Sequence, residues 1–318
     1  CLGNRSSGKG LEMKNKKGQI FTIIAILLIS LMFLSFEIFS SLYQSKSIKT
    51  RVSTMDNFLS STEENLVRQV YISGFRIIFL AENQITSTGT YVNVDNFFNE
   101  AFFNGTINGG ENNSILFGAT YDYLVSSLNN KAKKINVNIT LENSNLSVTQ
   151  NDPWNVNVTL TSDFVMSDMN ELARWEKIQI ISTLIPITFF EDPLFTVNSY
   201  AKVSRKINQT PYEGNYNNSG NISNLLLHVN GRYYAANPNA PSFLNRLEGN
   251  LSADANGIES FVYIPDFSAQ GILIKDKSII DYIYFSSENP AYHTVSGMPA
   301  WFKIDGNNHD NHTQKYGV

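Results

Sequence analysis

Cysteine, charge and catalytic motifs are all scarce in this chain of 318 residues. Cys1 is the only cysteine, so intrachain disulfides are excluded and any folded domain must be stabilised by its hydrophobic core. Charged residues make up only 16% of the chain, the net charge is −4, and there is no basic patch of the kind that binds nucleic acid. Neither H-E-x-x-H nor G-x-S-x-G occurs, and we expect no enzyme, no cofactor and no nucleic-acid partner.

Proline is absent from Ile20 to Ile85, and within this segment the residues up to Phe39 form a long apolar run. Twenty helical residues span roughly 30 Å, which is the thickness of the hydrocarbon core of a bilayer. A buried helix of a soluble protein is the alternative, but such a helix needs a polar face, which this run lacks. The sequence therefore predicts a transmembrane helix over residues 19–39.

Basic residues fix the expected orientation of this helix. Lys14, Lys16 and Lys17 directly precede it, whereas Lys46 and Lys49 follow it at a distance. The positive-inside bias predicts a cytoplasmic N-terminus and an extracellular C-terminal domain in a single-pass membrane protein. We read residues 1–18 as a cytoplasmic leader, and we expect Met13 to be the native start, with residues 1–12 outside the native protein.

The helix is expected to continue through residues 40–86 as an amphipathic segment. Apolar residues there follow steps of three, four and seven, which is typical of one helix face packed on a partner. This seam consists of Ile48, Val52, Met55, Leu59, Leu66 and Val70. Ser73-Gly74 is its weakest point, and the sequence TSTG at residues 86–89 predicts its end.

The junction before the apolar run, Lys16-Lys17-Gly18-Gln19, resembles the class III signal peptide of archaeal type IV pilin-like and archaellin-like proteins. In that family a prepilin peptidase cuts after the Gly, and the helix stays on the mature protein as anchor and filament core. The resemblance covers about 30 residues and implies a cut between Gly18 and Gln19. Bacterial pilins carry Glu at the fifth mature position, where this chain has Ile23. An uncleaved signal anchor is the alternative.

Beyond residue 86 the patterns predict an α+β ectodomain, largely antiparallel and β-rich. Short helices are expected at Val94–Phe103, Tyr121–Lys134 and Pro241–Glu248. Alternation of apolar residues with Asn or Thr predicts about five strands between Lys134 and Ile207, with a first hairpin turn at Asn143-Ser144 and a last strand at Leu194–Ile207.

We divide this ectodomain into residues 87–207, an exposed polar loop at 208–224, and a second part at 225–318. The second part is expected to contain strands at Ile258–Ile264 and Ser278–Phe285 and to end in a polar tail. Its segment Pro241–Phe285 resembles outer domains of uncharacterised archaeal membrane-anchored surface proteins.

Ten N-x-S/T sequons follow the apolar run, slightly more than composition alone would give. Asn138, Asn145 and Asn157 fall in predicted strands. The remaining seven are candidate glycosylation sites: Asn104, Asn112, Asn208, Asn217, Asn221, Asn250 and Asn311.

One cluster near the C-terminus has donors that suit a divalent cation, namely Asp305, His309, Asp310 and His312. It lacks the oxygen spacing of an EF-hand, so a solvated tail without metal is the preferred interpretation.

The sequence thus favours a membrane-anchored, type IV pilin-like surface subunit, of the minor or tip kind because its ectodomain is large. Its expected partners are the membrane, other copies or pilin-like subunits bound through the N-terminal helix, and the prepilin peptidase. An anchored adhesion protein that does not polymerise is the alternative, followed by a tethered binding module or enzyme.

Overall fold

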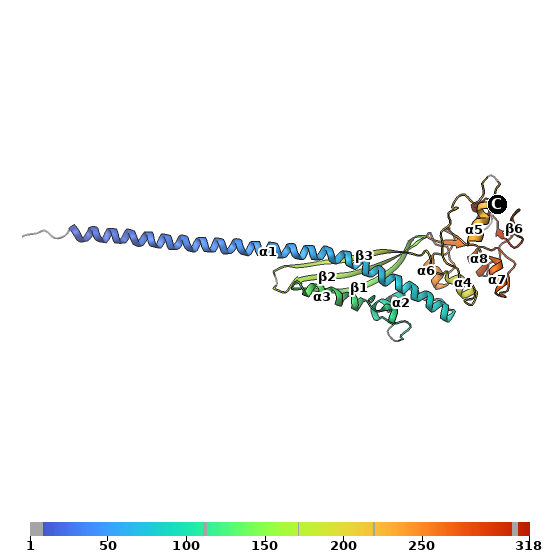
Figure 1. The fold of residues 1–318 in the computed structure, drawn as a ribbon, viewed down its shortest axis with the longest axis horizontal. Coiled ribbons are helices and arrows are strands. Elements are labelled where there is room, and N and C mark those ends of the chain that lie inside the picture. Colours follow the sequence, from blue (N-terminus) through green and yellow to red (C-terminus); the bar gives the residue numbers. More distant parts are fainter. Residues whose placement is uncertain (1–8, 111–112, 171, 219, 307–310) are drawn as a thin grey trace, which may run out of the picture. The chain divides into compact units, whose positions relative to one another are not determined.

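The structure is a computed structural model that describes residues 9–110, 113–170, 172–218, 220–306 and 311–318, with side chains from residue 18 onward (Figure 1). The chain divides into two compact units, residues 1–61 and residues 62–318. A long apolar N-terminal helix, an antiparallel sheet and short helices confirm the predicted α+β class.

Helix α1 extends from Lys9 to Thr88 and forms the whole described part of the first unit. It passes through Ser73-Gly74 without a break and ends at the predicted position. There, Gly89 adopts a left-handed conformation (φ 70°) and its N–H donates to the carbonyl of Ile85 at 2.8 Å. A glycine at this position is the usual way to stop a helix, because the left-handed region carries no Cβ penalty for glycine.

Burial changes along α1 as the amphipathic pattern predicts. Of the expected seam, Ile48 and Val52 are exposed, and the later residues are buried: Met55, Leu59, Leu66 and Val70. Within the second unit the same face continues in the core to Ile85.

Three antiparallel strands form the sheet of the second unit: β1 (Val137–Asp152), β2 (Asn155–Asp168) and β3 (Arg174–Pro186), in that order. Leu146 pairs with Leu160, which pairs with Ile181. The sequence predicted about five strands and was wrong on this count. Segments 134–142 and 145–150 belong to one strand, and no strand follows β3 up to Ile207 in the described residues.

The predicted hairpin turn at Asn143-Ser144 is a bulge inside β1. The register shifts between Glu142 and Asn145, Asn143 takes a φ of 49°, and its amide donates to the Asp163 carboxylate at 2.7 Å. Asn adopts the left-handed region more readily than other non-glycine residues, so the same residue suits a turn or a bulge. The actual turn lies at Pro153-Trp154, where the Trp154 N–H donates to the Asp152 carboxylate at 2.8 Å.

Helices cover one face of this sheet (Figure 1). On α1, a Cβ at Gly74 would lie 2.5 Å from Ile185 Cδ1 and 3.0 Å from Val158 Cγ2, so glycine permits a close approach of α1 to the sheet. Helix α3 (Tyr121–Lys133) was predicted correctly and packs on β1 through Leu124 and Leu128. The opposite face of β2 carries half-buried polar residues, mainly Asn and Thr.

A short helical segment precedes α3. It comprises α2 (Val94–Asn99), the π-helix η1 (Glu100–Asn104) and the 3-10 turn η2 (Ser114–Leu116). Arg76 on α1 donates to the carbonyls of Ile115 and Phe117 at 3.1 and 2.7 Å, which ties α1 to this turn.

The rest of the second unit consists of short elements around two strand pairs, β4–β5 and β6–β7. Its strands are β4 (Tyr234–Ala236), β5 (Ile258–Ser260), β6 (Tyr292–Thr294) and β7 (Lys303–Asp305). Its helices are α4 (Pro193–Asn198), α5 (Ser223–Gly231), α6 (Phe243–Glu248), α7 (Ile264–Ala269), α8 (Asp281–Phe285) and α9 (His312–Tyr316).

Two strand predictions fail in this region. Segment 194–207 begins with α4, because Asp192 caps the helix through a 2.9 Å bond from the Leu194 N–H and Pro193 occupies its first position. Segment 278–285 contains α8. Residues 278–284 are fully buried, and a short apolar run buried on all sides does not distinguish a strand from a helix.

Candidate functional site

The apolar part of α1 is the first candidate, because its surface has no cover in the described chain. Each large apolar side chain from Ile20 to Phe39 is exposed, and this stretch meets the length and composition of one membrane span. Gly18, at the expected cleavage position, is also exposed, and its carbonyl accepts a 2.9 Å bond from Thr22 Oγ1. Gln19 is exposed too, while the side chains of Lys16 and Lys17 lie outside the described residues.

The candidate glycosylation sites differ in accessibility. Asn104, Asn221, Asn250 and Asn311 are exposed, Asn208 and Asn217 are half-buried, and Asn112 lies outside the described residues. The Asn217 amide nitrogen donates to the carbonyl of Gly317 at 2.5 Å, so a glycan on that nitrogen would have to break this contact.

The C-terminal cluster is a buried ion network, and the expected solvated tail is wrong for its described residues. Asp305 and His312 have no exposed surface, while His309 and Asp310 lie outside the described residues. His312 Nδ1 lies 2.6 Å from Asp305 Oδ2, and its Nε2 lies 2.9 Å from Glu259 Oε2. Both ring nitrogens are thus engaged, and no metal-binding group of three ligands occurs among the residues the structure describes.

Electrostatics keep this network charged. Burial alone would lower the pKa of His312, but Glu259 and Asp305 raise it to about 10. Burial would also raise the pKa of Glu259, but Lys315 and His312 hold it well below its usual range. Lys315 Nζ and the Tyr316 hydroxyl both donate to Glu259 Oε1, at 2.6 and 2.8 Å, so α9 is bound to β5 by charge.

A second buried cluster surrounds Arg246, which bridges Asp192 and Asp281 at 2.5 and 2.9 Å. Tyr234 donates its hydroxyl to Asp192 at 2.8 Å, and Ser260 donates to Asp281 at 3.0 Å. Burial opposes the charge of Arg246, yet the two carboxylates hold its pKa above the ordinary value. All three charged side chains are fully buried, so this cluster has a structural role.

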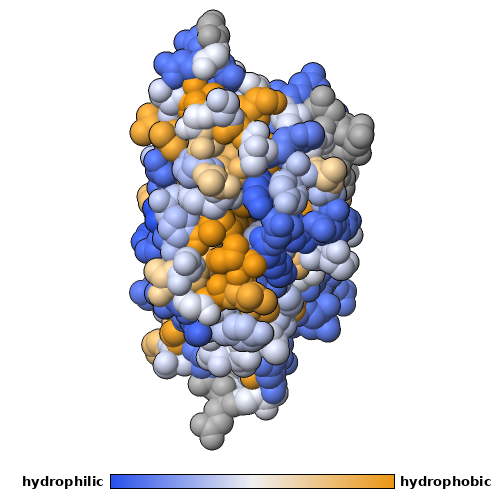
Figure 2. Space-filling view, turned by 90° about the vertical axis from the view of Figure 1, so that its right-hand side faces the viewer, coloured by the Kyte–Doolittle hydropathy of each residue, from blue (hydrophilic) through white to orange (hydrophobic). Residues whose placement is uncertain are grey.

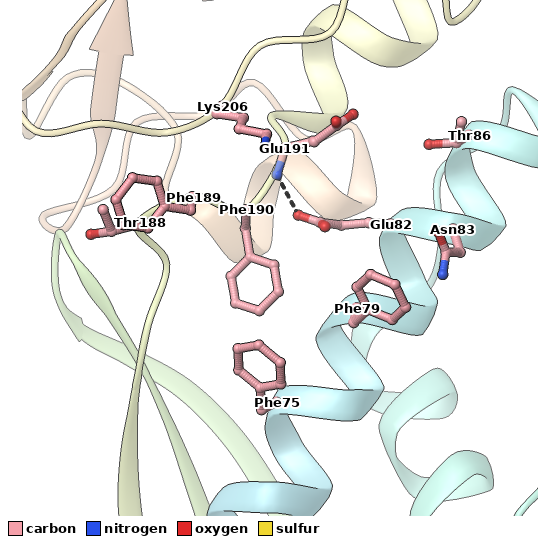
Figure 3. Close-up of a pocket in the computed structure, with 10 residues that line it drawn as sticks. All are labelled: Phe75, Phe79, Glu82, Asn83, Thr86, Thr188, Phe189, Phe190, Glu191 and Lys206. Atoms are coloured by element: carbon pink, nitrogen blue, oxygen red, sulfur yellow. Dashed lines mark hydrogen bonds between the residues drawn. The ribbon is translucent and has the colours of Figure 1, made fainter. Parts of the chain in front are cut away.

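Exposed apolar side chains also occur on the second unit, among them Phe117, Phe189, Tyr200 and Leu273. Figure 2 shows one face of the molecule on which apolar patches are bordered by hydrophilic residues. A cavity of about 450 Å³ beside α1 combines aromatic rings with charged side chains and is the candidate site on this unit (Figure 3).

Two short sequences build this aromatic cavity. Helix α1 supplies Phe75 and Phe79, one turn apart, and the segment after β3 supplies Phe189 and Phe190. The rings of Phe75 and Phe190 lie 5.2 Å apart between centroids and are tilted by 44°. Phe189 adopts a φ of 75°, which is strained for an aromatic residue, and leaves 71% of its surface exposed. The polar part of the lining consists of Glu82, Asn83, Thr86, Thr188, Glu191 and Lys206.

Glu82 is the polar centre of this cavity. Its Oε1 accepts a 2.6 Å bond from the backbone N–H of Glu191, which fixes the carboxyl group beside the rings (Figure 3). Burial raises the pKa of Glu82 to about 8, and the charges of Glu191 and Asp192 add to the effect, while Lys206 opposes it. A carboxyl group that ionises near neutral pH in an aromatic cavity is typical of a ligand site.

This cavity was not predicted from the sequence, although two local signals were present. Tyr71, Phe75 and Phe79 recur every four residues on α1, a spacing that places them on one helix face. Phe189-Phe190-Glu191 precedes the cap of α4. Only the fold brings the two segments together, across more than a hundred residues of chain.

No family model, no curated protein and no solved structure matches this chain.

Proposed function

We propose that the protein is a single-pass, membrane-anchored surface subunit of the type IV pilin-like kind, which associates with copies of itself or related subunits through α1. The observation that carries this proposal is the uncovered apolar surface of residues 20–39 on a helix that continues unbroken into the second unit. Removing so many large apolar side chains from water is worth on the order of tens of kcal/mol, so lipid or other helices must cover them.

The flanking residues support an orientation. Lys14, Lys16 and Lys17 precede the run and keep the N-terminus cytoplasmic, which sends the second unit outside the cell. Glu37 lies in the last turn of the run, where a carboxylate costs little at the interface but several kcal/mol near the bilayer centre.

Lateral association is supported by the composition of the run. Its surface is mostly Ile, Leu and Phe, and Ser30 and Ser35 are small enough to permit close helix contacts or interhelical hydrogen bonds. If a peptidase removes the residues up to Gly18, the mature helix begins without a polar head. Packing against other helices then becomes its main means of retention.

Mass spectrometry of the N-terminus of the protein isolated from its native membrane tests the processing step. We expect Gln19 as the first residue, and we expect Gly18→Leu to retain Lys16 and Lys17. Thr22→Leu is the matched control, because it alters the apolar run and leaves the Gly18-Gln19 bond intact. A native N-terminus at Met13 or Lys14 would refute processing and favour the uncleaved anchor.

Cysteine crosslinking tests the association step, because Cys1 is the only cysteine in the chain and can be replaced. In a Cys1→Ser background, Ser30→Cys should form disulfide-linked dimers in the membrane, whereas Ser147→Cys on the sheet should not. Equal crosslinking of the two variants, or none at Ser30, would contradict lateral association and leave the anchored protein that does not polymerise.

A further inference from the structure

We propose that the aromatic cavity beside α1 binds a small organic ammonium ion, with the cationic group between the phenylalanine rings and the Glu82 carboxylate. This site is independent of any association through the N-terminal helix. The cavity belongs wholly to the second unit, and its volume of about 450 Å³ is in the range of small-molecule sites.

The aromatic lining suits a cation with alkyl substituents. Phe75, Phe79 and Phe190 present rings toward the cavity from two elements, and Phe189 borders it from the other side (Figure 3). Ring faces carry negative electrostatic potential and attract ammonium groups, most strongly where water is excluded, and several rings around one cation form the usual cage for alkylated ammonium. The same rings also gain from apolar contact with the alkyl groups.

The charges of the lining favour a ligand with a single positive charge. Glu82 and Glu191 are opposed by one cation, Lys206. A monocationic ligand therefore balances the lining once both carboxyl groups are ionised. An anionic ligand would add a third negative charge, and a neutral apolar ligand would leave Glu82 protonated, so only a cation gains from the ionised carboxylate.

Glu82 has an oxygen free to receive the cation. Oε1 is held by the N–H of Glu191, and within the described part of the chain no hydrogen bond reaches Oε2. One oxygen thus positions the carboxyl group and the other remains for a ligand.

This arrangement couples binding to pH. Burial raises the pKa of Glu82 to about 8, so at neutral pH the empty site holds mostly the protonated acid. A cation binds the ionised form better, so binding releases a proton and affinity rises with pH up to about 8. The charged groups that face Glu82 are Glu191, Asp192 and Lys206.

Choline and its neutral carbon analogue, 3,3-dimethylbutan-1-ol, are the matched probes, because they share size and shape and differ in charge. Both are titrated by calorimetry into the full chain in dodecyl maltoside micelles, a detergent without an ammonium group. We expect choline to bind about 75-fold tighter at pH 8.5 than at pH 6, following the ionised fraction of Glu82 at a pKa of about 8. The neutral analogue should bind more weakly at pH 8.5, with no pH dependence.

Variants assign the effect to the cavity. Glu82→Gln should abolish the pH dependence and weaken choline binding at pH 8.5 by a factor similar to that pH effect, because a neutral amide replaces the carboxylate. Phe79→Leu keeps apolar volume, removes one ring and should weaken choline more than the analogue. Phe117→Leu, at an exposed ring outside the cavity, should change neither.

Several results would overturn the proposal. These are equal binding of the two probes, a choline affinity that does not change with pH, and an unaltered pH profile in Glu82→Gln. No choline binding at millimolar concentration would also do so. The wild-type pH profile and Phe79→Leu decide the matter even where Glu82→Gln fails to fold.

Discussion

Replacing His312 with Gln should make the second unit less stable at neutral pH and remove a specific part of its pH dependence. His312 is fully buried between Asp305 and Glu259, with bonds of 2.6 and 2.9 Å on its two nitrogens. Gln is of similar length and can still donate a hydrogen bond, but it carries no charge. The substitution therefore leaves two buried carboxylates with less compensation, and removing one partner of a buried ion pair typically costs about 3–5 kcal/mol.

The pH dependence follows from the direction of the shift. The pKa of His312 rises from 6.5 in the unfolded chain to about 10 in the folded one. A raised pKa means that the charged imidazolium stabilises the fold fully below pH 6.5, and that this contribution is lost as pH rises through 10. Linkage over this interval predicts that His312 contributes about 2.5 kcal/mol less to the free energy of unfolding at pH 9 than at pH 7.

Urea unfolding of the full chain in detergent, followed by tryptophan fluorescence, measures this contribution at pH 7 and pH 9. Trp301 lies half-buried against Tyr263 in the second unit and reports on that region. The raised pKa of Glu82 also destabilises the fold across this interval, so the quantity to compare is the difference between wild type and His312→Gln. His293→Gln, at an exposed histidine, is the control and should match wild type at both pH values.

This prediction fails if the stability gap between wild type and His312→Gln is the same at pH 7 and pH 9. It also fails if the gap at pH 7 is below about 1 kcal/mol, which would mean that the two carboxylates need no cation beyond Lys315.

Two further substitutions probe the same unit. Gly257→Ala should lower the free energy of unfolding by about 3 kcal/mol or more, because its Cβ would lie 2.0 Å from the Ala240 carbonyl oxygen. Gly271→Ala is the control: its Cβ would have no atom within 4 Å, so only its φ of 65° costs energy, about 1 kcal/mol. Urea unfolding measures both. Arg246→Met should lower the free energy of unfolding by about 3–5 kcal/mol, because it leaves the carboxylates of Asp192 and Asp281 without a cation. Adding Asp192→Asn and Asp281→Asn to Arg246→Met should recover part of that loss. No recovery would contradict the assignment of the cost to uncompensated charge.

The parts of the fold that sequence predicted well are those whose signals are local. Helix α1 follows from a long apolar and then amphipathic period without proline, and its end follows from Gly89. Helix α3 has a capping Thr120 and a basic last turn, both visible in sequence. Strand β2 alternates buried and half-buried residues along its whole length, so its period could be recognised directly.

The predictions that failed concern segments whose structure depends on tertiary contacts. Residues 278–284 are buried on all sides, so no period distinguished helix α8 from a strand. Asn143 has the same left-handed preference in a bulge as in a turn, and only pairing with β2 settles which one forms. His312 was expected in a solvated tail because its neighbours in sequence are polar. In the structure it is buried and hydrogen-bonded to Glu259, which lies more than fifty residues earlier. The aromatic cavity also depends on contacts that no local pattern encodes.

The buried charges explain how a region of such short elements keeps one arrangement. Its strands have three residues each and its helices five to nine, too short to be stable alone, and no disulfide can join them because Cys1 is the only cysteine. Arg246 joins the start of α4 to α8, and Glu259 joins β5 to α9, so each network connects segments far apart in sequence. Hydrophobic contacts would tolerate shifted packings of such elements, whereas a buried charge is stable only opposite its partner. We infer that these networks contribute mainly to the specificity of the fold, and that the stability itself comes from the surrounding apolar core.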